Sequence, residues 1–398
     1  MANSLLTPVA VTREALRILH QKLNFVGNIV REYDDSFAKS GAKIGDTLKI
    51  RLPNQYTVRT GATLSAQDTS ETNVALQVAT QKGVDLNFTS ADLTMSLDDF
   101  SSRILEPAMS VLAANMEADA LSMYKDVANS VWNGGSAATL SRVLQGRKIL
   151  QDHLAPSNDR TALLNTQDQV DIVTDVKGLF NAQEVIAKQY KEGYVGRTAG
   201  FDFAENTLVP AHSRGAANGA YTTNTTALAT DGTEYAAITV ATGTGTLKKG
   251  DVVTIAGINR VHPESKADQG VARQFVVTAD YAGGGGSVAI SPSIVLGGAK
   301  QNCVAAATGA TQAVSVAGTA STAVGTSLLF QKEAFAFATA DLVMPQGVDF
   351  ARREVMDGIS MRVVRQYDIN SDRFPTRLDV LYGYKTLRGA LACRLHNN

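Results

Sequence analysis

The strongest constraint on the fold is a change in the character of the sequence near residue 216. From about residue 216 to residue 326 the chain is rich in Gly, Ala, Thr and Ser and has almost no helix-forming pattern. Short strand-forming runs are separated by turn signals such as Gly250-Asp251 and the glycines at 283–286. This pattern is typical of a small all-β module. Because residues 139–210 mix helix and strand patterns, we expect the module to be inserted into an α/β chain.

Strand patterns fill both the module and the C-terminal segment that begins at residue 327. The predicted strands are 237–240, 251–256, 274–278 and 287–290 in the module, and 330–343, 359–367, 376–384 and 390–395 after it. We expect the C-terminal strands to pair with strands that precede the module.

An amphipathic helix is predicted near the N-terminus. Thr12 is a suitable N-cap, and the apolar residues that follow at steps of three and four are Leu16, Leu19, Leu23, Val26 and Val30. This helix either packs on its own domain or forms an arm that docks on a neighbouring subunit.

A long polar hairpin is predicted next. Residues 44–53 alternate as a strand does, residues 54–73 have few large apolar groups, and 74–78 and 84–88 alternate again. Loops of this length are usually functional or mobile, and a hairpin this polar cannot bury a core of its own. It either leans on another surface, for which a neighbouring subunit is a good candidate, or is a floppy surface loop.

The strongest helix pattern follows the hairpin. Ser96 and Asp99 form a capping box, and an apolar stripe with three methionines, Met109, Met116 and Met123, continues toward Asn133-Gly134-Gly135. A helix over 107–132 would be about 39 Å long. We expect the methionines to pack in a core. Further on, helices are predicted at 140–154, 167–173 and 182–191, and short strands at 162–165 and 206–210.

Charge and cysteine content exclude several classes of protein. Lys+Arg number 37 and Asp+Glu 38, which gives a net charge of -1, whereas a freestanding nucleic-acid binder carries a basic excess. Two cysteines, Cys303 and Cys393, make neither a disulfide framework nor a metal cluster, so we expect a reducing compartment. We expect no secretion signal in residues 1–10 and no membrane span.

No catalytic constellation is present in the sequence. The common nucleotide-binding, zinc-protease and serine-hydrolase motifs are absent, and Gly243 to Gly250 resembles a phosphate loop only loosely because a strand follows it. The five histidines lie at no metal-ligand spacing. We therefore expect no catalytic, cofactor-binding or metal-binding residues and no cofactor, and favour a self-assembling structural protein over an enzyme.

The module and the C-terminus resemble a known family. The segments that carry the resemblance are Leu247-Lys248-Lys249-Gly250-Asp251, Ala256-Gly257, Gln274-Phe275-Val276-Val277 and Ile290-Ser291-Pro292. They are similar to the insertion domain of the P22-type coat proteins of tailed bacteriophages. Residues 379–387, together with Arg394 and Leu395, resemble the closing β-hairpin of phage major capsid proteins. The order of elements over nearly the whole chain matches the HK97-type capsid fold.

The resemblance implies an α+β fold of HK97 type with an N-arm, an extended loop, a spine helix, peripheral and axial domains, and an inserted small β-barrel. The domains it implies are the N-terminal arm 1–43, the extended loop 44–88, the peripheral domain 89–139, the axial domain 140–215, the inserted domain 216–326, and a return to the axial and peripheral domains over 327–398.

The implied function is that of a major capsid protein, which self-assembles into the hexamers and pentamers of an icosahedral phage head around double-stranded DNA. The implied partners are further copies of the chain, a scaffolding protein, a portal protein at one vertex, a decoration protein and non-specifically packaged DNA, with no membrane. The implied location is the virion, after assembly in the host cytoplasm. Some relatives lock their shells with a Lys–Asn bond, but nothing in this sequence identifies such a pair and coats with this insert generally do without it, so we expect no autocatalytic cross-link.

The polar hairpin holds the residues expected to contact a neighbouring subunit. They are Arg51, Tyr56, Arg59, Asp68 and Glu71; the other interpretation is that the charges are simply solvated. Three other functions remain open from the sequence. A phage tail-tube or other virion structural protein would share the β-rich, Gly- and Thr-rich character but not the long helix, an enzyme would need a polar pocket, and an encapsulin shell would lack the insert.

Overall fold

The computed structural model describes residues 8–34, 47–64, 66–67, 71–89, 101–176, 196–218, 221–224, 228–305, 311–370 and 373–397. The chain divides into two compact units. Unit 1 comprises Met1–Ile50, Asn73–Leu121 and Phe335–Leu387, and unit 2 comprises Arg51–Thr72, Ser122–Ala334 and Arg388–Asn398. Each unit is therefore built from segments that are far apart in the sequence.

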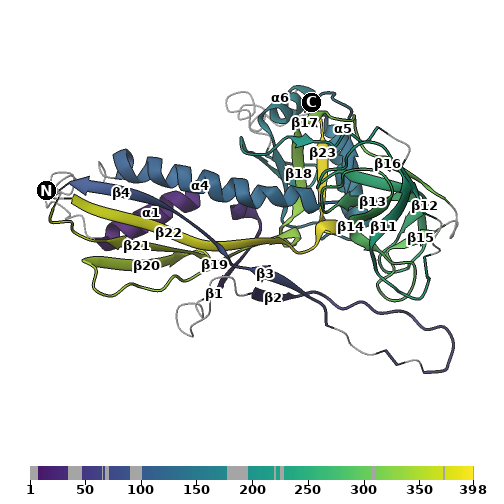
Figure 1. The fold of residues 1–398 in the computed structure, drawn as a ribbon, viewed down its shortest axis with the longest axis horizontal. Helices are drawn as coiled ribbons and strands as arrows, with labels where there is room; N and C mark the ends of the chain where they lie inside the picture. The colour runs from purple at the N-terminus through teal and green to yellow at the C-terminus, as the bar shows by residue number, and fades with distance from the viewer. Residues whose placement is uncertain are drawn as a thin grey trace. The chain divides into compact units, whose positions relative to one another are not determined.

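Unit 1 is a six-stranded sheet covered by two helices (Figure 1). The strand order is β1-β19-β22-β21-β20, and β4 also pairs with the long strand β22. The strand bounds are β1 Val30–Asp34, β4 Thr80–Thr89, β19 Phe335–Ala340, β20 Phe350–Met356, β21 Ile359–Arg365 and β22 Arg373–Thr386. Helix α1 (Pro8–Lys22) packs on β20, β21 and helix α4 (Glu106–Leu121), and α4 also contacts β4. The expected pairing of C-terminal strands with earlier ones is confirmed by β22 with β4 and by β19 with β1.

The N-terminal helix differs in its ends from the prediction. Thr12 lies inside α1 and is buried, so it is not the N-cap, and the helix ends at Lys22. Beyond it Val26 lies in a short 3₁₀ turn and Val30 begins β1. The apolar spacing continued across the end of the helix because Val26 and its neighbours are also buried in unit 1.

The predicted 39 Å helix is wrong in length. Helix α4 has 16 residues, which corresponds to about 24 Å. It is preceded by a π-helical turn, Ser101–Leu105, and followed by a 3₁₀ turn, Ser122–Asp126. Val131, counted in the helical stripe, instead lies in strand β5 (Ser130–Trp132), which pairs in parallel with β23 (Ala392–His396). Pairing in the sheet therefore decides the structure there. The spacing of apolar residues in a short run cannot by itself distinguish a strand from a continuing helix. The three methionines are buried, as predicted.

A buried carboxylate connects α4 to the chain after α1. Glu117 is 1% exposed, and it accepts hydrogen bonds from the backbone N–H groups of Phe25, at 2.8 and 3.1 Å, and Val26, at 3.3 Å. Both N–H groups lie at the start of the 3₁₀ turn, where backbone donors have no partner within the turn itself. Unit 1 therefore compensates for a buried negative charge with backbone donors.

The predicted hairpin strands are confirmed. Strands β2 (Thr47–Arg51) and β3 (Asn73–Gln77) pair as a two-stranded sheet, and Leu76 and Val78 are buried against β19 in unit 1. Between them, the described residues within 52–72 contain no helix or strand. The hairpin therefore has an anchored base and a long irregular tip.

Unit 2 contains a second six-stranded sheet, ordered β5-β23-β18-β6-β8-β7. Its remaining strands are β6 Arg160–Leu164, β7 Arg197–Thr198, β8 Phe201–Glu205 and β18 Thr326–Gln331. Helix α5 (Leu140–Asp152) packs on β23, β18 and β5, and helix α6 (Thr166–Val176) packs on α5 and β6. Strands β9 (His212–Ser213) and β17 (Ala323–Val324) pair where the chain leaves and re-enters this part of unit 2.

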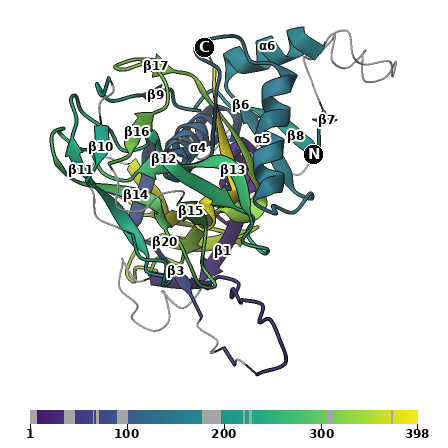
Figure 2. The same ribbon diagram turned by 90° about the vertical axis from the view of Figure 1, so that its right-hand side faces the viewer.

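The segment between β9 and β17 folds as a separate seven-stranded sheet, as the composition predicted for an all-β module (Figure 2). The strands are β10 Tyr221–Thr223, β11 Tyr235–Thr242, β12 Val252–Val261, β13 Asp268–Val277, β14 Gly286–Ile294, β15 Cys303–Ala305 and β16 Ala313–Val316. The pairings run β13-β14-β11-β10-β16-β12, and β12 pairs back to β13, so six strands form a closed ring. Phe275, Val277, Ile255 and Val253 are buried in its core.

Two further predictions are wrong. The chain at 206–210 is not a strand, because the Asn206 side chain accepts a hydrogen bond from the Leu208 N–H at 2.8 Å and turns the backbone; the strand there is β8, just before it. The expected closing hairpin is also absent, since β22 and β23 belong to different sheets. The helix predicted at 182–191 and the capping box at Ser96 and Asp99 lie outside the described residues.

Candidate functional site

The hairpin tip, residues 52–72, carries the residues predicted to contact another subunit. Its base is closed by the Leu52 N–H, which donates to the Thr72 carbonyl at 2.8 Å. Arg51 Nη1 lies 3.4 Å from Glu71 Oε1, with the two side chains 78% and 57% exposed. The structure therefore brings two of the predicted contact residues together within one chain, as an exposed ion pair of the kind that contributes little to stability.

Farther along the tip, side chains replace the missing strand pairing. Gln67 bridges the two sides of the loop: its side chain accepts from the Thr57 N–H at 2.8 Å and donates to the Thr57 carbonyl at 2.6 Å. Arg59 donates to the carbonyls of Gly61 and Thr63 and so curls over the turn. Asp68 lies outside the described residues. Arg59 thus shapes its own loop in the single chain.

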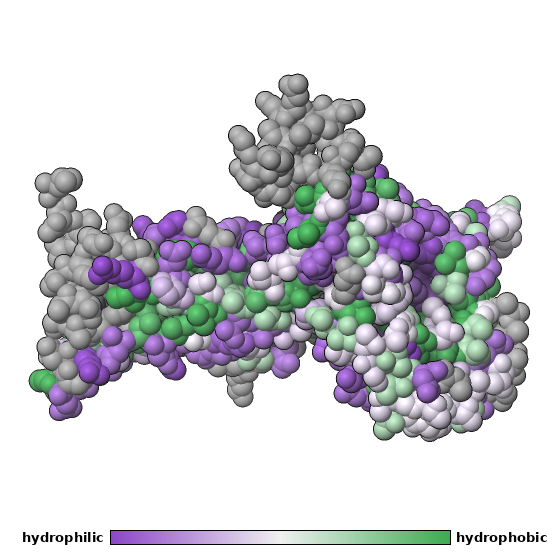
Figure 3. Space-filling model, turned by 90° about the horizontal axis from the view of Figure 1, so that it is seen from above, coloured by the Kyte–Doolittle hydropathy of each residue, from purple (hydrophilic) through white to green (hydrophobic). Residues whose placement is uncertain are grey.

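The tip also exposes apolar side chains. Val58 is 94% exposed, Leu64 81% and Tyr56 55%. Elsewhere, single apolar residues such as Val111 on α4 are also exposed, and the face in Figure 3 mixes hydrophobic and hydrophilic residues. Isolated exposed apolar residues are normal on a protein surface. In the tip, however, three such side chains lie on one thin loop, and among the described residues they are not buried in any core.

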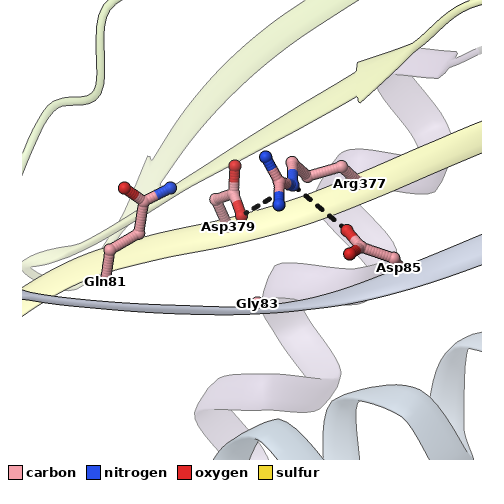
Figure 4. A pocket seen from close by; sticks show the side chains of 5 residues that line it. All are labelled: Gln81, Gly83, Asp85, Arg377 and Asp379. Carbon is pink, nitrogen blue, oxygen red and sulfur yellow. Dashed lines mark hydrogen bonds and ion pairs between the residues drawn. The ribbon is translucent and has the colours of Figure 1, made fainter.

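Unit 1 contains a polar pocket in its sheet. Its cavity of about 300 Å³ is lined by Gln81, Gly83, Asp85, Arg377 and Asp379, from β4 and β22 (Figure 4). Arg377 Nε lies 3.1 Å from Asp85 Oδ1 and 3.5 Å from Asp379 Oδ1, and Arg362 binds the other oxygen of Asp379 at 2.7 Å. The two arginines and two aspartates offset one another's charges, so these groups form an ion-pair network that joins β4, β21 and β22.

A glycine is required at the floor of this pocket. A Cβ on Gly83 would collide with the Leu378 carbonyl oxygen and with Asp379 Oδ1. Since Gly83 faces Asp379 across the β4–β22 pair, its missing side chain makes room for the buried carboxylate. The pocket is therefore part of how the sheet accommodates Asp379.

Unit 2 contains a buried polar cluster that the sequence analysis missed. His212 Nε2 lies 2.9 Å from Asp251 Oδ1, and the Tyr124 hydroxyl lies 3.3 Å from His212 Nδ1. Asp251 also accepts from the backbone N–H groups of Gly215 and Lys248, at 3.1 and 2.9 Å. Arg394 on β23 donates to the Gly250 carbonyl at 2.8 Å. The cluster thus fastens the turn before β12 to the six-stranded sheet.

Burial sets the protonation of this cluster. Burial, together with the charges of Arg394 and His212, lowers the pKa of His396 well below its ordinary value. Burial also lowers the pKa of Arg394 to about 10 and raises that of Tyr124. At neutral pH His396 is uncharged and Arg394 is charged. The charged Arg394 can therefore donate to the Gly250 carbonyl and connect the two sheets.

Two further contacts complete the joint. Gln274 on β13 accepts from the Ser130 N–H at 2.8 Å and donates to its carbonyl at 2.9 Å. Arg260 on β12 lies 2.7 Å from Asp152 at the end of α5. No short motif marks these residues; the signal in the sequence is a charged residue inside an apolar run, as with Arg394 between Cys393 and Leu395.

Among the described residues, no cluster of three or more His, Cys, Asp or Glu side chains is placed to hold a metal ion. Within the same ranges, no helix combines the length and apolar character needed to cross a membrane.

Comparison with known structures gives phage shells at low identity. The chain is similar to a Mycobacterium phage Che8 structure (TM-score 0.43, 11% identity, 94% of this chain and 90% of that one). It is also similar to the capsid structure of Cyanophage P-SCSP1u (0.45, 10%, 93% and 86%) and to the satellite phage P4 procapsid that includes the size determination protein (0.43, 9%, 97% and 91%). No curated protein matches the sequence. Since these TM-scores lie below 0.5, the assignment rests on the family comparison.

The family comparison is decisive. Residues 25–393 match the model of the family described as P22 coat protein, gene protein 5. The match covers both units, the hairpin and the seven-stranded sheet. It decides for the coat protein over the tail-tube alternative, and the chain belongs to the P22 coat protein family, the major capsid proteins of tailed bacteriophages.

Proposed function

We propose that this coat protein assembles as hexamers and pentamers of an icosahedral head around double-stranded DNA, and that the hairpin tip supplies contacts between subunits. The observation that carries the proposal is the tip itself: Tyr56, Val58 and Leu64 are exposed on a loop that has no core of its own in the described residues. Packing on a second copy would remove this apolar surface from water, which favours association. The role is structural rather than enzymatic.

The proposed domain roles follow the order of elements. Residues 1–43 act as the N-terminal arm, 44–88 as the extended loop over the next subunit, and 89–139 as the peripheral domain around α4. Residues 140–215 form the axial domain, and 327–398 return to both. The closed ring of six strands supports assigning 216–326 as an inserted β-barrel. The resemblance to the coat proteins suggests the outer surface of the shell as its place.

The proposed partners are a scaffolding protein during assembly, a portal protein at one vertex and a decoration protein on the finished shell. The net charge of -1 supports packaged DNA as non-specific contents, because a strongly basic wall would bind the phosphates and retain the DNA. Assembly takes place in the host cytoplasm. The shell is held by many weak contacts without covalent cross-links; a ladder of covalent oligomers on denaturing electrophoresis of particles would contradict this.

The assembly role of the hairpin is tested by charge reversal at Arg59. We expect Arg59→Glu, produced together with the neighbouring genes, to give few closed shells by negative-stain electron microscopy, because the turn it holds would lose both its shape and its charge. The monomer should unfold at the same urea concentration as wild type. The matched control is Arg197→Glu, whose side chain is 61% exposed in unit 2 outside the hairpin. Equal particle yields for Arg59→Glu and wild type would contradict the proposal.

A further inference from the structure

Arg273 on β13 is a buried cation with no compensating partner in the described part of the chain. Its side chain belongs to a residue only 9% exposed, and its Nε is buried without a hydrogen-bond acceptor. No described carboxylate lies within ion-pair distance of it. The buried residues Arg160, Arg214 and Arg394 also lack a carboxylate partner, but each donates to backbone carbonyls, and no such bond is made by Arg273 in the described ranges. A buried charge left unpaired is strongly destabilising unless something offsets it.

Two further nitrogen-bearing side chains lie beside Arg273. Asn259 pairs with Ala272, so Arg260 and Arg273 each stand one residue from that pair on neighbouring strands. His153, which caps the C-terminal end of α5 directly after Asp152, is 8% exposed. Its ring lies near the Ile149 backbone, but neither ring nitrogen makes a hydrogen bond of normal geometry with a described residue. Burial, and then the charges of Arg273 and Arg260, lower the pKa of His153 to about 3.

The negative charge nearby is too small for this set. Asp152 lies 2.7 Å from Arg260 and so neutralises that guanidinium. Cys303 faces Arg260 across the β12–β15 pair, but burial raises the pKa of its thiol to about 11, so it is uncharged at neutral pH. One positive charge, on Arg273, remains uncompensated.

We propose that Arg273, Arg260 and His153 form a binding site for a small tetrahedral oxyanion, such as inorganic phosphate, at the junction of β12, β13 and the end of α5. A guanidinium group donates paired N–H bonds to such an ion in the geometry that phosphate oxygens accept. The neutral imidazole of His153 donates one further N–H. The ion places the missing negative charge next to Arg273 and stabilises the contact between the seven-stranded sheet and α5. The site is independent of the proposed assembly contacts of the hairpin.

The test is titration of the full-length, unassembled protein with inorganic phosphate against sodium chloride of equal ionic strength. We expect saturable binding at one site by calorimetry and a phosphate-dependent rise in the thermal midpoint, because a ligand that binds only the folded state stabilises it. Arg273→Gln should weaken phosphate binding at least tenfold and abolish the thermal shift. The control Arg197→Gln, at an exposed arginine of the same unit, should leave both unchanged.

Two further measurements keep the test decisive if Arg273→Gln folds poorly. His153→Leu should reduce the affinity for phosphate severalfold without removing it. A short DNA duplex at equal phosphate concentration should produce no Arg273-dependent shift, because a duplex cannot enter a buried site. The proposal is overturned if phosphate acts no differently from chloride, if Arg273→Gln retains the full response, or if the duplex gives a larger Arg273-dependent shift than phosphate does.

Discussion

The hairpin tip and the seven-stranded sheet both contain Gly and Thr, but only the sheet is built of strands, and the two regions satisfy their backbone and apolar groups in opposite ways. The sheet closes its pairings into a ring and buries Phe275, Val277 and Ile255 inside it. The tip has side-chain bridges in place of a ladder and leaves Val58 and Leu64 exposed. Closure satisfies the backbone and the apolar residues within one chain, whereas an open hairpin depends on another surface. The comparison separates the part of a coat subunit that folds alone from the part expected to be completed by assembly.

The largest difference between the two regions should appear on truncating a large apolar side chain in each. Phe275→Ala should lower the free energy of unfolding by about 3–5 kcal/mol, because Phe275 is fully buried in the ring and its removal leaves a cavity. Val58→Ala in the tip should change it by less than about 0.5 kcal/mol. Urea unfolding of the two variants measures both values, and similar losses would remove the distinction.

An intermediate effect is expected from pH, and it arises at buried histidines outside the tip, namely His153 at the end of α5 and His396 on β23. The folded protein holds the pKa of His153 at about 3, below that of the unfolded chain, so the unfolded state takes up a proton that the folded state excludes. The free energy of unfolding is therefore not reduced by His153 above about pH 6.5. It falls by up to about 1.4 kcal/mol per pH unit as the pH drops toward 3.

His153→Phe should reduce, without abolishing, this acid dependence of the urea midpoint between pH 6 and pH 4, because buried His396, whose pKa is also lowered, contributes to it as well. The tip contains no histidine, so its Arg59→Glu variant should retain the wild-type dependence. An unchanged pH profile in His153→Phe would show that the ring of His153 is not held in its neutral form.

The smallest effect is expected at the ion pair that closes the tip. Arg51→Ala and Glu71→Ala should each change the free energy of unfolding by only about 0.2–1 kcal/mol, since both side chains are mostly exposed. A double-mutant cycle by urea unfolding of the monomer gives the coupling energy of the Arg51–Glu71 pair. The same variants are then compared for the stability of assembled particles. A coupling well above about 1 kcal/mol in the monomer would show that the tip is more ordered in the single chain than its exposure implies.

The hairpin strands and four strands of the module, β11 to β14, were predictable because their signals are local, whereas the short strands β10, β15 and β16 were not predicted. Alternation around Leu48, Ile50 and Leu76 marks strands with two different faces, and the structure buries one face of β3. Gly250 has a φ of +99°, which a turn before β12 requires and which other residues rarely adopt. Patterns confined to a few residues therefore identified most elements of the seven-stranded sheet.

The features that were predicted wrongly or missed depend on contacts between segments that are distant in the sequence. The apolar spacing of α4 continued through Val131, and only pairing with β23 shows that this residue lies in a strand. His212, Asp251 and Arg394 converge from three segments, and no spacing in the sequence reports that. Likewise β22 and β23, adjacent in sequence, separate into two sheets. Among the predicted contact residues, Arg51 and Glu71 pair with each other and Arg59 donates to carbonyls of its own loop, so the contacts described for them lie within one chain.

Hydrogen–deuterium exchange of the unassembled protein and of assembled particles tests the central claim most directly. We expect the backbone amides of residues 52–64 to exchange fast in the unassembled protein and to become protected in particles, because a neighbouring copy covers the tip. The amides of β11, β12 and β14 should be protected in both forms, since the closed ring satisfies them within one chain. Fast exchange of the tip in intact particles would contradict the account.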